Sequence, residues 1–267
     1  IPQSPTYNNP INYPENCTKR RNVVLDRMLS NGVITQEEHD AAQAEPLVLN
    51  STEPSTTGIE AYPYFTSYVR DQLTNANGKY AYSKDELFKG GLKVYTTLDV
   101  SMQEAAEAAA RKKEQAAGSN YEVAMVAIDP DNGYIKALVG GKDYDASQVN
   151  MATGTGGSGR QAGSSFKTFT LVAAIEQGID PSTMIDASAT AKLPGWEVAN
   201  INHTDYGTKS ISDAFAVSSN TAFARLILSI GPDKVVDVAK RMGITSPLTA
   251  TGSLTLGSES VTPLEMA

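Results

Sequence analysis

Cysteine is almost absent from this sequence of 267 residues, in which Cys17 is the only one. A single cysteine cannot form a disulfide within the chain, so cysteine usage does not indicate a redox compartment. We expect Cys17 to act as a small hydrophobic side chain. Histidine is also scarce, and His39 and His203 have neither nearby cysteines nor paired ligand spacing. The sequence therefore predicts no metal site and no cofactor.

An excess of basic residues and a long hydrophobic run are lacking too. The formal net charge is -8, which gives nucleic acid or anionic lipid no electrostatic attraction to this chain. No stretch approaches the roughly 18 apolar residues of a membrane span, and no signal peptide is present. The chain starts at Ile1 in a polar, proline-rich run and ends at Ala267 within a pattern, so we expect a piece of a longer polypeptide. The missing targeting segment then says little about location.

The composition is that of a globular protein, with 40% hydrophobic and 19% charged residues. The length favours about two structural units, with one sizeable core and smaller attached parts.

The first 119 residues carry mostly helix signals. Four prolines favour an irregular strap over residues 1–18. A Thr-x-x-Glu capping box at Thr35 predicts a helix start, and Asp99 caps an alanine-rich helix that ends at Gly118. The remaining expectations are a helix over 20–30, a linker over 46–58, a helix over 62–75, a capped turn at 83–86 and a strand over 92–98.

The composition changes at Asn120. Two apolar runs, 122–129 and 134–139, flank a Pro-Asp-Asn-Gly turn and predict a β-hairpin that opens a new domain. The Gly-rich run 153–159 lacks the context of a phosphate-binding loop, and we expect a flexible loop. Helices are expected over 164–177, 210–217, 221–229 and 233–242. Strands followed by helices indicate an α+β fold.

The sequence Ser-Ser-Phe-Lys at 164–167 stands where a glycine-containing loop becomes a helix. Ser164 would lie at the helix N-terminus, with Lys167 one turn later on the same face. A serine hydroxyl needs a base to become a nucleophile, and a lysine serves only if burial lowers its pKa. Nearby apolar residues, Phe166 among them, would bury it. The alternative is an N-cap serine followed by a solvated lysine, because a lone Ser-x-x-Lys match is weak.

A second polar motif, Ser-Ser-Asn at 218–220, stands in a break between two helical runs. Plain helix capping could explain it as well as catalysis does. Ser218 and Asn220 gain weight as candidates from their combination with Ser164 and Lys167, since two motifs are more specific than one.

The chain resembles the serine penicillin-recognising enzymes, which share Ser-x-x-Lys and Ser-x-Asn elements. It is most similar to class A penicillin-binding proteins. Four segments carry that resemblance besides 218–223: Arg-Gln-Ala-Gly-Ser-Ser-Phe-Lys at 160–167, the run 256–266, the linker-like 91–99, and 20–28, which is similar to a glycosyltransferase tail. They occur in the order expected for the family and extend over nearly the whole chain.

Some family features are missing. Ala162 and Thr168 stand where the family usually has proline. No Lys-Thr-Gly or Lys-Ser-Gly triplet occurs, and the resemblance implies that this strand lies after Ala267 as a required partner segment. The fold is therefore expected to be of the penicillin-recognising α+β type, incomplete at its C-terminal side. The glutamate motif of the glycosyltransferase is absent, so we assign no glycosyl transfer.

The resemblance implies a peptidoglycan D,D-transpeptidase that β-lactams acylate. Ser164 would attack the carbonyl of a stem peptide ending in D-Ala-D-Ala, and its backbone N–H would form half of the oxyanion hole. Lys167 is the expected proton acceptor, although the acylation base is disputed in this superfamily. Ser218 would pass the proton to the leaving D-alanine, and Asn220 would donate to the substrate carbonyl.

The resemblance also implies a domain division and a location. Residues 1–91 would be the glycosyltransferase tail and linker, 92–119 a linker strand and helix, and 120–267 the N-terminal part of the transpeptidase domain. The protein would act at the outer face of the bacterial cytoplasmic membrane, held by an N-terminal helix that this chain does not contain.

Other polar residues receive structural interpretations. Asp129 and Asp131 fit the chemistry of the hairpin turn. Trp196, Glu197 and Asn200 precede the second motif in a Pro-Gly loop, and we expect them to pack at the surface.

Two other functions remain open. A carboxypeptidase or β-lactamase would resolve the acyl-enzyme with water, but no convincing Glu-x-x-x-Asn follows the second motif. A non-catalytic penicillin-binding or scaffolding module would follow from a true loss of the Lys-Thr-Gly strand.

Overall fold

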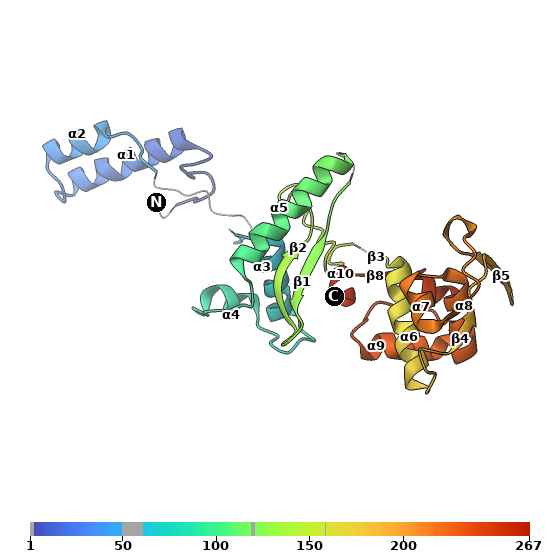
Figure 1. Cartoon of the computed structure of the whole chain (residues 1–267). Helices are drawn as coiled ribbons and strands as arrows, with labels where there is room; N and C mark the ends of the chain where they lie inside the picture. Colours follow the sequence, from blue (N-terminus) through green and yellow to red (C-terminus); the bar gives the residue numbers. More distant parts are fainter. Residues whose placement is uncertain (1–2, 50–60, 119–120, 158) are drawn as a thin grey trace. The chain divides into compact units, whose positions relative to one another are not determined.

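The computed structural model describes residues 3–49, 61–118, 121–157 and 159–267 (Figure 1). The chain divides into two compact units, Ile1–Gly58 and Ile59–Ala267. The linker predicted over 46–58 lies mostly outside the described residues.

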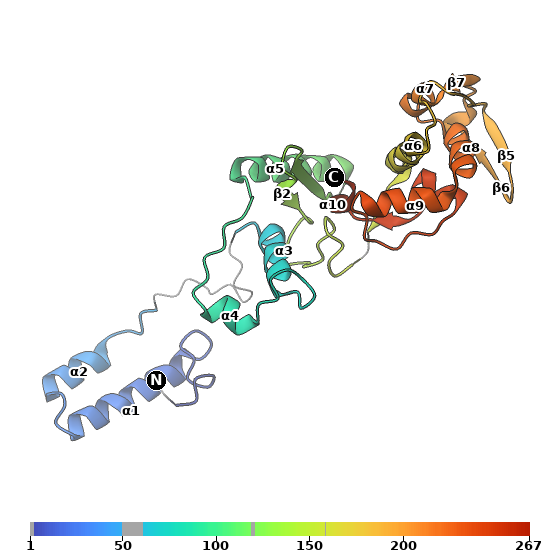
Figure 2. The same cartoon turned by 90° about the horizontal axis from the view of Figure 1, so that it is seen from below.

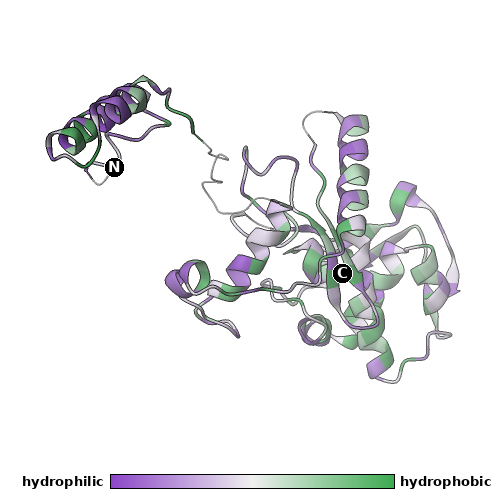
Figure 3. Cartoon of the chain, turned by 90° about the vertical axis from the view of Figure 1, so that its left-hand side faces the viewer, coloured by the Kyte–Doolittle hydropathy of each residue, from purple (hydrophilic) through white to green (hydrophobic). Residues whose placement is uncertain are grey.

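Unit 1 is a helical hairpin of α1 (Pro14–Ser30) and α2 (Gln36–Ala44). Helix α1 begins six residues earlier than predicted, because Pro14 occupies the first turn, where its missing N–H costs no hydrogen bond. The predicted capping box of α2 is confirmed: the Thr35 side chain accepts from the Glu38 N–H, and Glu38 accepts from the Thr35 N–H. Figure 3 shows mostly hydrophilic residues along this hairpin. Cys17 is a buried residue of α1, as expected for a small hydrophobic side chain.

A buried histidine joins the two helices of unit 1. His39 Nε2 lies 2.9 Å from Asp26 Oδ1, and its Nδ1 lies 2.9 Å from Asp40 Oδ1. Hydrogen bonds to Asp40 and Asp26 raise the pKa of His39 above 6.5, while the bond to His39 lowers the pKa of Asp40. The contribution of protonated His39 to stability is therefore fully present below pH 6.5 and is lost as the pH rises through its raised folded-state pKa.

We expect the imidazole of His39 to titrate with a midpoint above 6.5 in an NMR titration of the whole chain, where His203 supplies the only other imidazole. Asp26→Asn should lower this midpoint, because it removes one of the two carboxylates that favour the charged ring. An unchanged midpoint in this variant would show that the contact between α1 and α2 does not determine the charge of His39.

The first part of unit 2 places one long helix on a β-hairpin. The elements are α3 (Pro63–Thr74), α4 (Lys84–Lys89), α5 (Val100–Ala117), β1 (Met125–Asp129) and β2 (Tyr134–Val139). Strands β1 and β2 pair antiparallel, as the turn predicted, and α5 packs on them through a cluster that includes Ala106, Ala110 and Val139 (Figure 1). Predictions for α3, the capped α4 and α5 are confirmed.

The strand predicted over 92–98 is wrong. This segment has no strand ladder. Within the described residues it bonds to β2 through Thr97 Oγ1, which donates to the Ile135 carbonyl at 2.6 Å, and the N–H of the following residue, Asp99, donates to the Lys136 carbonyl at 2.9 Å. A β-branched, aromatic run favours extended backbone, but a strand also needs a partner in register. Tyr95 is 91% exposed, so the segment lacks a packed face as well.

The rest of unit 2 is built around a helical core. Helix α6 (Lys167–Glu176), α8 (Asn220–Ile230) and α9 (Pro232–Arg241) pack together, with α7 (Ile211–Ala216) beside them (Figure 2). Phe166, Phe169, Phe223 and Ile227 lie in this core. Three small antiparallel sheets surround it: β3 (Arg160–Gln161) with β8 (Ser260–Val261), β4 (Met184–Asp186) with β7 (Thr208–Ser210), and β5 (Thr190–Leu193) with β6 (Trp196–Ala199). The α+β prediction is confirmed.

Candidate active site

The first segment of the site is the turn into α6. Residues Gly163–Phe166 form a 3₁₀ helix, η1, and the α-helical part begins at Lys167. Gly163 has a φ of +61°, a conformation that glycine adopts without a Cβ penalty. Ser164 is exposed at this turn, whereas Lys167 is only 1% exposed. The hydroxyl therefore faces solvent while the amine lies beneath it.

The second segment is the turn between α7 and α8. Ser218 has a φ of +53°, which is uncommon for a residue with a side chain. Ser219 is the N-cap of α8, and its hydroxyl accepts from the Ala222 N–H. Capping explains Ser219, but it does not explain Ser218 or Asn220, whose side chains face Lys167.

Lys167 Nζ joins the two segments. It lies 3.0 Å from Ser164 Oγ and 3.0 Å from Ser218 Oγ. It also lies 2.8 Å from the Ser218 carbonyl oxygen and 2.8 Å from Asn220 Oδ1. All four candidate residues meet at one amine, although more than fifty positions separate the two motifs in sequence.

Burial lowers the pKa of Lys167 from 10.5 to about 8. At pH 7 about one tenth of the lysine is then neutral, compared with roughly one part in 3,000 at the ordinary pKa. The Phe223 ring centroid lies 6.0 Å from Nζ and forms part of the apolar surroundings. When Lys167 is neutral, the Ser218 carbonyl and Asn220 Oδ1 can accept its two hydrogens, because both oxygens are acceptors only. The lone pair is then available to the hydroxyl of Ser164.

The run 252–266 supports the first segment from the other side. β8 pairs with β3, immediately before the nucleophile turn, and η3 (Gly252–Leu256) packs on α8 and η1. Gly257, with a φ of +66°, approaches Gly163 so closely that a Cβ would lie 2.3 Å from the Gly163 backbone N and O. Any side chain at position 257 would therefore displace the residue next to Ser164.

The surface interpretation of Asn200 is wrong. Asn200 is 4% exposed and hydrogen-bonds the second motif, with Ser219 Oγ donating to its Oδ1 at 3.0 Å. No local pattern around Asn200 indicates this role, because its partners come from residues 187–221 and meet only in the folded chain. Glu197 is exposed, as expected, while Trp196 lies against Gly252.

The two histidines do not lie in this site. His39 belongs to unit 1, and His203 is an exposed residue of the 3₁₀ helix Ile201–His203. In the described part of the chain, no group of three or more His, Cys, Asp or Glu side chains could hold a metal ion.

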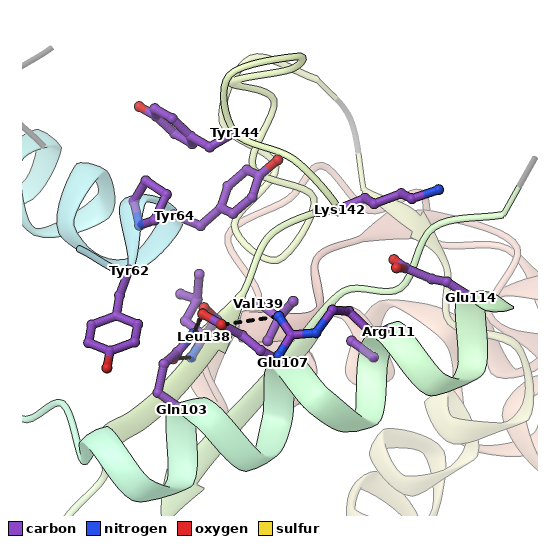
Figure 4. Close-up of a pocket in the computed structure, with 13 residues that line it drawn as sticks. Tyr62, Tyr64, Gln103, Glu107, Arg111, Glu114, Leu138, Val139, Lys142 and Tyr144 are labelled. Atoms are coloured by element: carbon purple, nitrogen blue, oxygen red, sulfur yellow. Dashed lines mark hydrogen bonds and ion pairs between the residues drawn. The ribbon is translucent and has the colours of Figure 1, made fainter. Parts of the chain in front are cut away.

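A separate cavity of about 150 Å³ lies between α3, α5 and β2 (Figure 4). Its polar side chains bond within the chain: Gln103 exchanges two hydrogen bonds with the Leu138 backbone, and Glu114 Oε1 accepts from the Val123 N–H at 2.9 Å. These bonds fasten α5 to the hairpin. The cavity is also smaller than the roughly 300 Å³ at which ordinary ligand pockets begin.

Comparison with known families identifies the protein family of this chain. Residues 123–267 match the model of the penicillin binding protein transpeptidase domain. The chain belongs to this family. The matched residues include the two segments that meet at Lys167, and the resemblance to class A penicillin-binding proteins is confirmed.

Relatives of this transpeptidase family match almost the whole chain. Penicillin-binding protein 2D of Bacillus subtilis is 32% identical over 100% of this chain and 38% of its own length. Penicillin-binding protein 1A of Mycolicibacterium smegmatis is 34% identical over 91% of this chain and 30% of its own length. The chain thus spans well under half the length of these curated relatives.

Solved structures of the family share the fold. Penicillin-binding protein PonA1 from Mycobacterium tuberculosis has a TM-score of 0.65 at 31% identity, over 76% of this chain and 53% of that one. The same protein has been solved in complex with penicillin V. Penicillin-binding protein 1A from Haemophilus influenzae has a TM-score of 0.76 at 25% identity, over 100% of this chain and 53% of that one. Among the described residues of our chain, no helix is long and apolar enough to cross a membrane.

Proposed function

We propose that the protein is a peptidoglycan D,D-transpeptidase that forms an acyl-enzyme through Ser164 and is acylated there by β-lactams. The observation that supports this most is the position of Lys167 Nζ, 3.0 Å from the hydroxyls of both Ser164 and Ser218. A buried amine between two hydroxyls can take a proton from one and return it through the other. Membership of the transpeptidase family supports the proposed substrate class, stem peptides ending in D-Ala-D-Ala.

The proposed acylation begins with neutral Lys167. Its lone pair takes the hydroxyl proton of Ser164 as Oγ attacks the carbonyl carbon of the penultimate D-alanine. Ser218 then delivers a proton to the amide nitrogen, the C–N bond breaks, and the terminal D-alanine leaves. The proton on Lys167 replaces the one that Ser218 gave. In the second half, an amine of a neighbouring stem peptide attacks the ester carbonyl and gives up a proton to neutral Lys167. The ester C–O bond then breaks, Lys167 returns that proton to Ser164 Oγ, and the cross-linked peptide leaves.

Substrate binding is assigned to Asn220 and to the backbone of Ser164. One hydrogen of the Asn220 amide goes to the Ala199 carbonyl at 3.0 Å, and the other is free for the substrate carbonyl in this proposal. The Ser164 N–H would supply half of the oxyanion hole. We propose that a Lys-Thr-Gly strand following Ala267 is the partner segment that supplies the other half and binds the substrate carboxylate.

We also propose how the chain divides into domains and where the whole protein lies in the cell. Residues 1–91 would be a glycosyltransferase tail and linker, 92–119 a linker helix with its preceding segment, and 120–267 the transpeptidase part. Relatives of this family are longer than the present chain, and we propose that the whole protein is anchored in the cytoplasmic membrane with this site on its outer face.

The test of the function is covalent labelling at one identifiable peptide. We expect the natural polypeptide that carries these residues to gain the mass of one penicillin. After trypsin digestion the adduct should lie on residues 161–167, because Arg160 and Lys167 are the cleavage sites. Fragment ions must separate Ser164 from Ser165, which is on the same peptide. No adduct, or an adduct on another peptide, would overturn the proposal.

The lifetime of the adduct distinguishes the hydrolytic alternative. A transpeptidase retains the penicilloyl group because no amine acceptor attacks its ester bond. A β-lactamase hydrolyses this ester with water in every catalytic cycle and so releases the group rapidly. Rapid loss of the adduct with release of penicilloic acid would therefore replace the transpeptidase proposal by a hydrolase.

A further inference from the structure

Asn200 is a buried amide with bonds at every polar atom. Its Nδ2 donates to the carbonyl oxygens of Ala187, Ser188 and Thr204 at 3.0, 3.1 and 2.9 Å. Its Oδ1 accepts from Ser219 Oγ at 3.0 Å and from the Thr221 N–H at 3.1 Å. One side chain thereby ties the loop around 187–204 to the turn at the start of α8.

This turn supplies three of the four oxygens around Lys167 Nζ: two from Ser218 and one from Asn220. The backbone of this turn is strained, because Ser218 has a φ of +53°, in the left-handed region. Strained turns persist only where surrounding contacts hold them. The residues that Asn200 bonds, Ser219 and Thr221, flank Asn220 directly.

The neighbour of Asn200 fixes the amide orientation of Asn220. The Ala199 carbonyl accepts from Asn220 Nδ2 at 3.0 Å, which turns Oδ1 toward Lys167. Because Ala199 precedes Asn200 in the chain, displacement of Asn200 would move this acceptor too.

We propose that Asn200 is a positioning residue for acylation: it holds the turn 218–220 so that the Ser218 and Asn220 oxygens converge on Lys167. Among the described residues, no hydrogen bond joins the Asn200 side chain to Lys167 or Ser164, so it acts through Ser219, Thr221 and Ala199. The inference rests on the proposed function of the site. The inference goes beyond the proposed function by assigning a residue outside both motifs to the acylation step.

A purely structural role is the alternative, and Asn150 provides the matched control. Asn150 is 2% exposed and also bridges distant backbone: its Nδ2 donates to the Tyr64 carbonyl at 3.1 Å, and its Oδ1 accepts from the Ala152 N–H at 3.2 Å. In the described part of the chain, neither Tyr64 nor Ala152 is among the hydrogen-bond partners of Lys167 Nζ, which are Ser164, Ser218 and Asn220. Replacement of Asn150 should therefore cost stability without changing the chemistry of Lys167.

The experiment compares Asn200→Ala with Asn150→Ala in the natural polypeptide, using a fluorescent penicillin. The first-order acylation constant at saturating penicillin is measured from pH 6 to pH 10 on the folded fraction, which thermal unfolding defines. We expect Asn200→Ala to lower the constant about 10-fold or more, since small misplacements of a catalytic group can cost up to about 100-fold. Its acid-limb midpoint should rise, because a loosened turn admits water to Nζ. Asn150→Ala should keep the wild-type constant and midpoint.

Ser219→Ala is the second variant, for the case in which Asn200→Ala does not fold. It removes one of the bonds to Asn200 Oδ1 and should move the constant and the midpoint in the same direction by a smaller amount. The inference would be overturned if Asn200→Ala and Ser219→Ala both kept the wild-type acylation constant and midpoint. It would also be overturned if Asn150→Ala lowered the acylation constant as much as Asn200→Ala does. Absence of labelling at Ser164 in the wild-type protein would instead overturn the proposed function, so the two failures are distinguishable.

Discussion

Ser164→Ala is expected to abolish covalent penicillin labelling of the natural polypeptide that carries this chain. The substitution removes the oxygen that lies 3.0 Å from Lys167 Nζ and is exposed to an incoming substrate. Because the side chain is exposed, its loss should leave the unfolding temperature within the small range typical of surface substitutions. Gel fluorescence and intact mass after incubation with a fluorescent penicillin measure the effect.

Ser165→Ala is the matched control for this prediction. Ser165 is the next residue, is also exposed, and its hydroxyl donates to the Ala162 carbonyl at 2.6 Å rather than to Lys167. Labelling should persist in this variant. Undiminished labelling of Ser164→Ala, or loss of labelling only in Ser165→Ala, would show that the nucleophile is not Ser164.

Lys167→Ala should slow acylation by about 10² or more, the usual scale for a positioned general base. The neutral fraction of Lys167 rises with pH until its pKa of about 8 is passed. The acylation rate of the wild-type protein should therefore increase from pH 6, reach half of its maximum at about pH 8, and level off at about one pH unit above that. Stopped-flow or quenched labelling across this range checks both the magnitude and the shape.

Two variants separate the chemistry from packing. Lys167→Met keeps most of the buried volume without an amine, so it should lose the pH-dependent limb even if it is more stable than the alanine variant. Lys192→Ala removes an exposed lysine of β5 and should leave the rate unchanged. A rate for Lys167→Ala within a few-fold of wild type would make Lys167 a bystander, and another group would then have to accept the proton.

The proposed base, Lys167, depends physically on the proposed positioning residue, Asn200. Lys167 is useful only if its amine is dry and its two hydrogens are occupied, and both conditions depend on the turn 218–220. The turn itself depends on the hydrogen bonds that Ser219 Oγ and the Thr221 N–H donate to Asn200 Oδ1. A loss at Asn200 should therefore resemble a weakened Lys167 in its pH dependence rather than a loss of the nucleophile.

Local features of the fold could be predicted from the sequence because their causes lie within a few residues. The capping boxes at Thr35 and Ser83 were predicted correctly, as was the hairpin around Gly133. In each case a side chain bonds a backbone group three residues away, or a turn residue sets the backbone angle. The pairing of Ser164 with Lys167 is of the same kind, since one helical turn separates them.

Features that need distant partners were not predicted. The apolar run 92–98 has the composition of a strand, but no ladder forms on it, and composition does not reveal whether a partner is in register. Asn200 resembled a surface residue because its bonding partners other than Thr204, such as Ser219 and the Ala187 carbonyl, lie more than ten positions away along the chain.

The sequence by itself determined most of the helices, the capping boxes at Thr35 and Ser83, the hairpin and the two motifs, along with the family that those motifs indicate. Only the tertiary structure decided that Ser218 and Asn220 meet Lys167, that Gly257 abuts Gly163, and that Asn200 is buried. The physical reason is the range of the interactions. Capping and turn formation act over one or two turns of chain, whereas the dry surroundings that lower the pKa of Lys167 exist only once α6 and α8 have packed together.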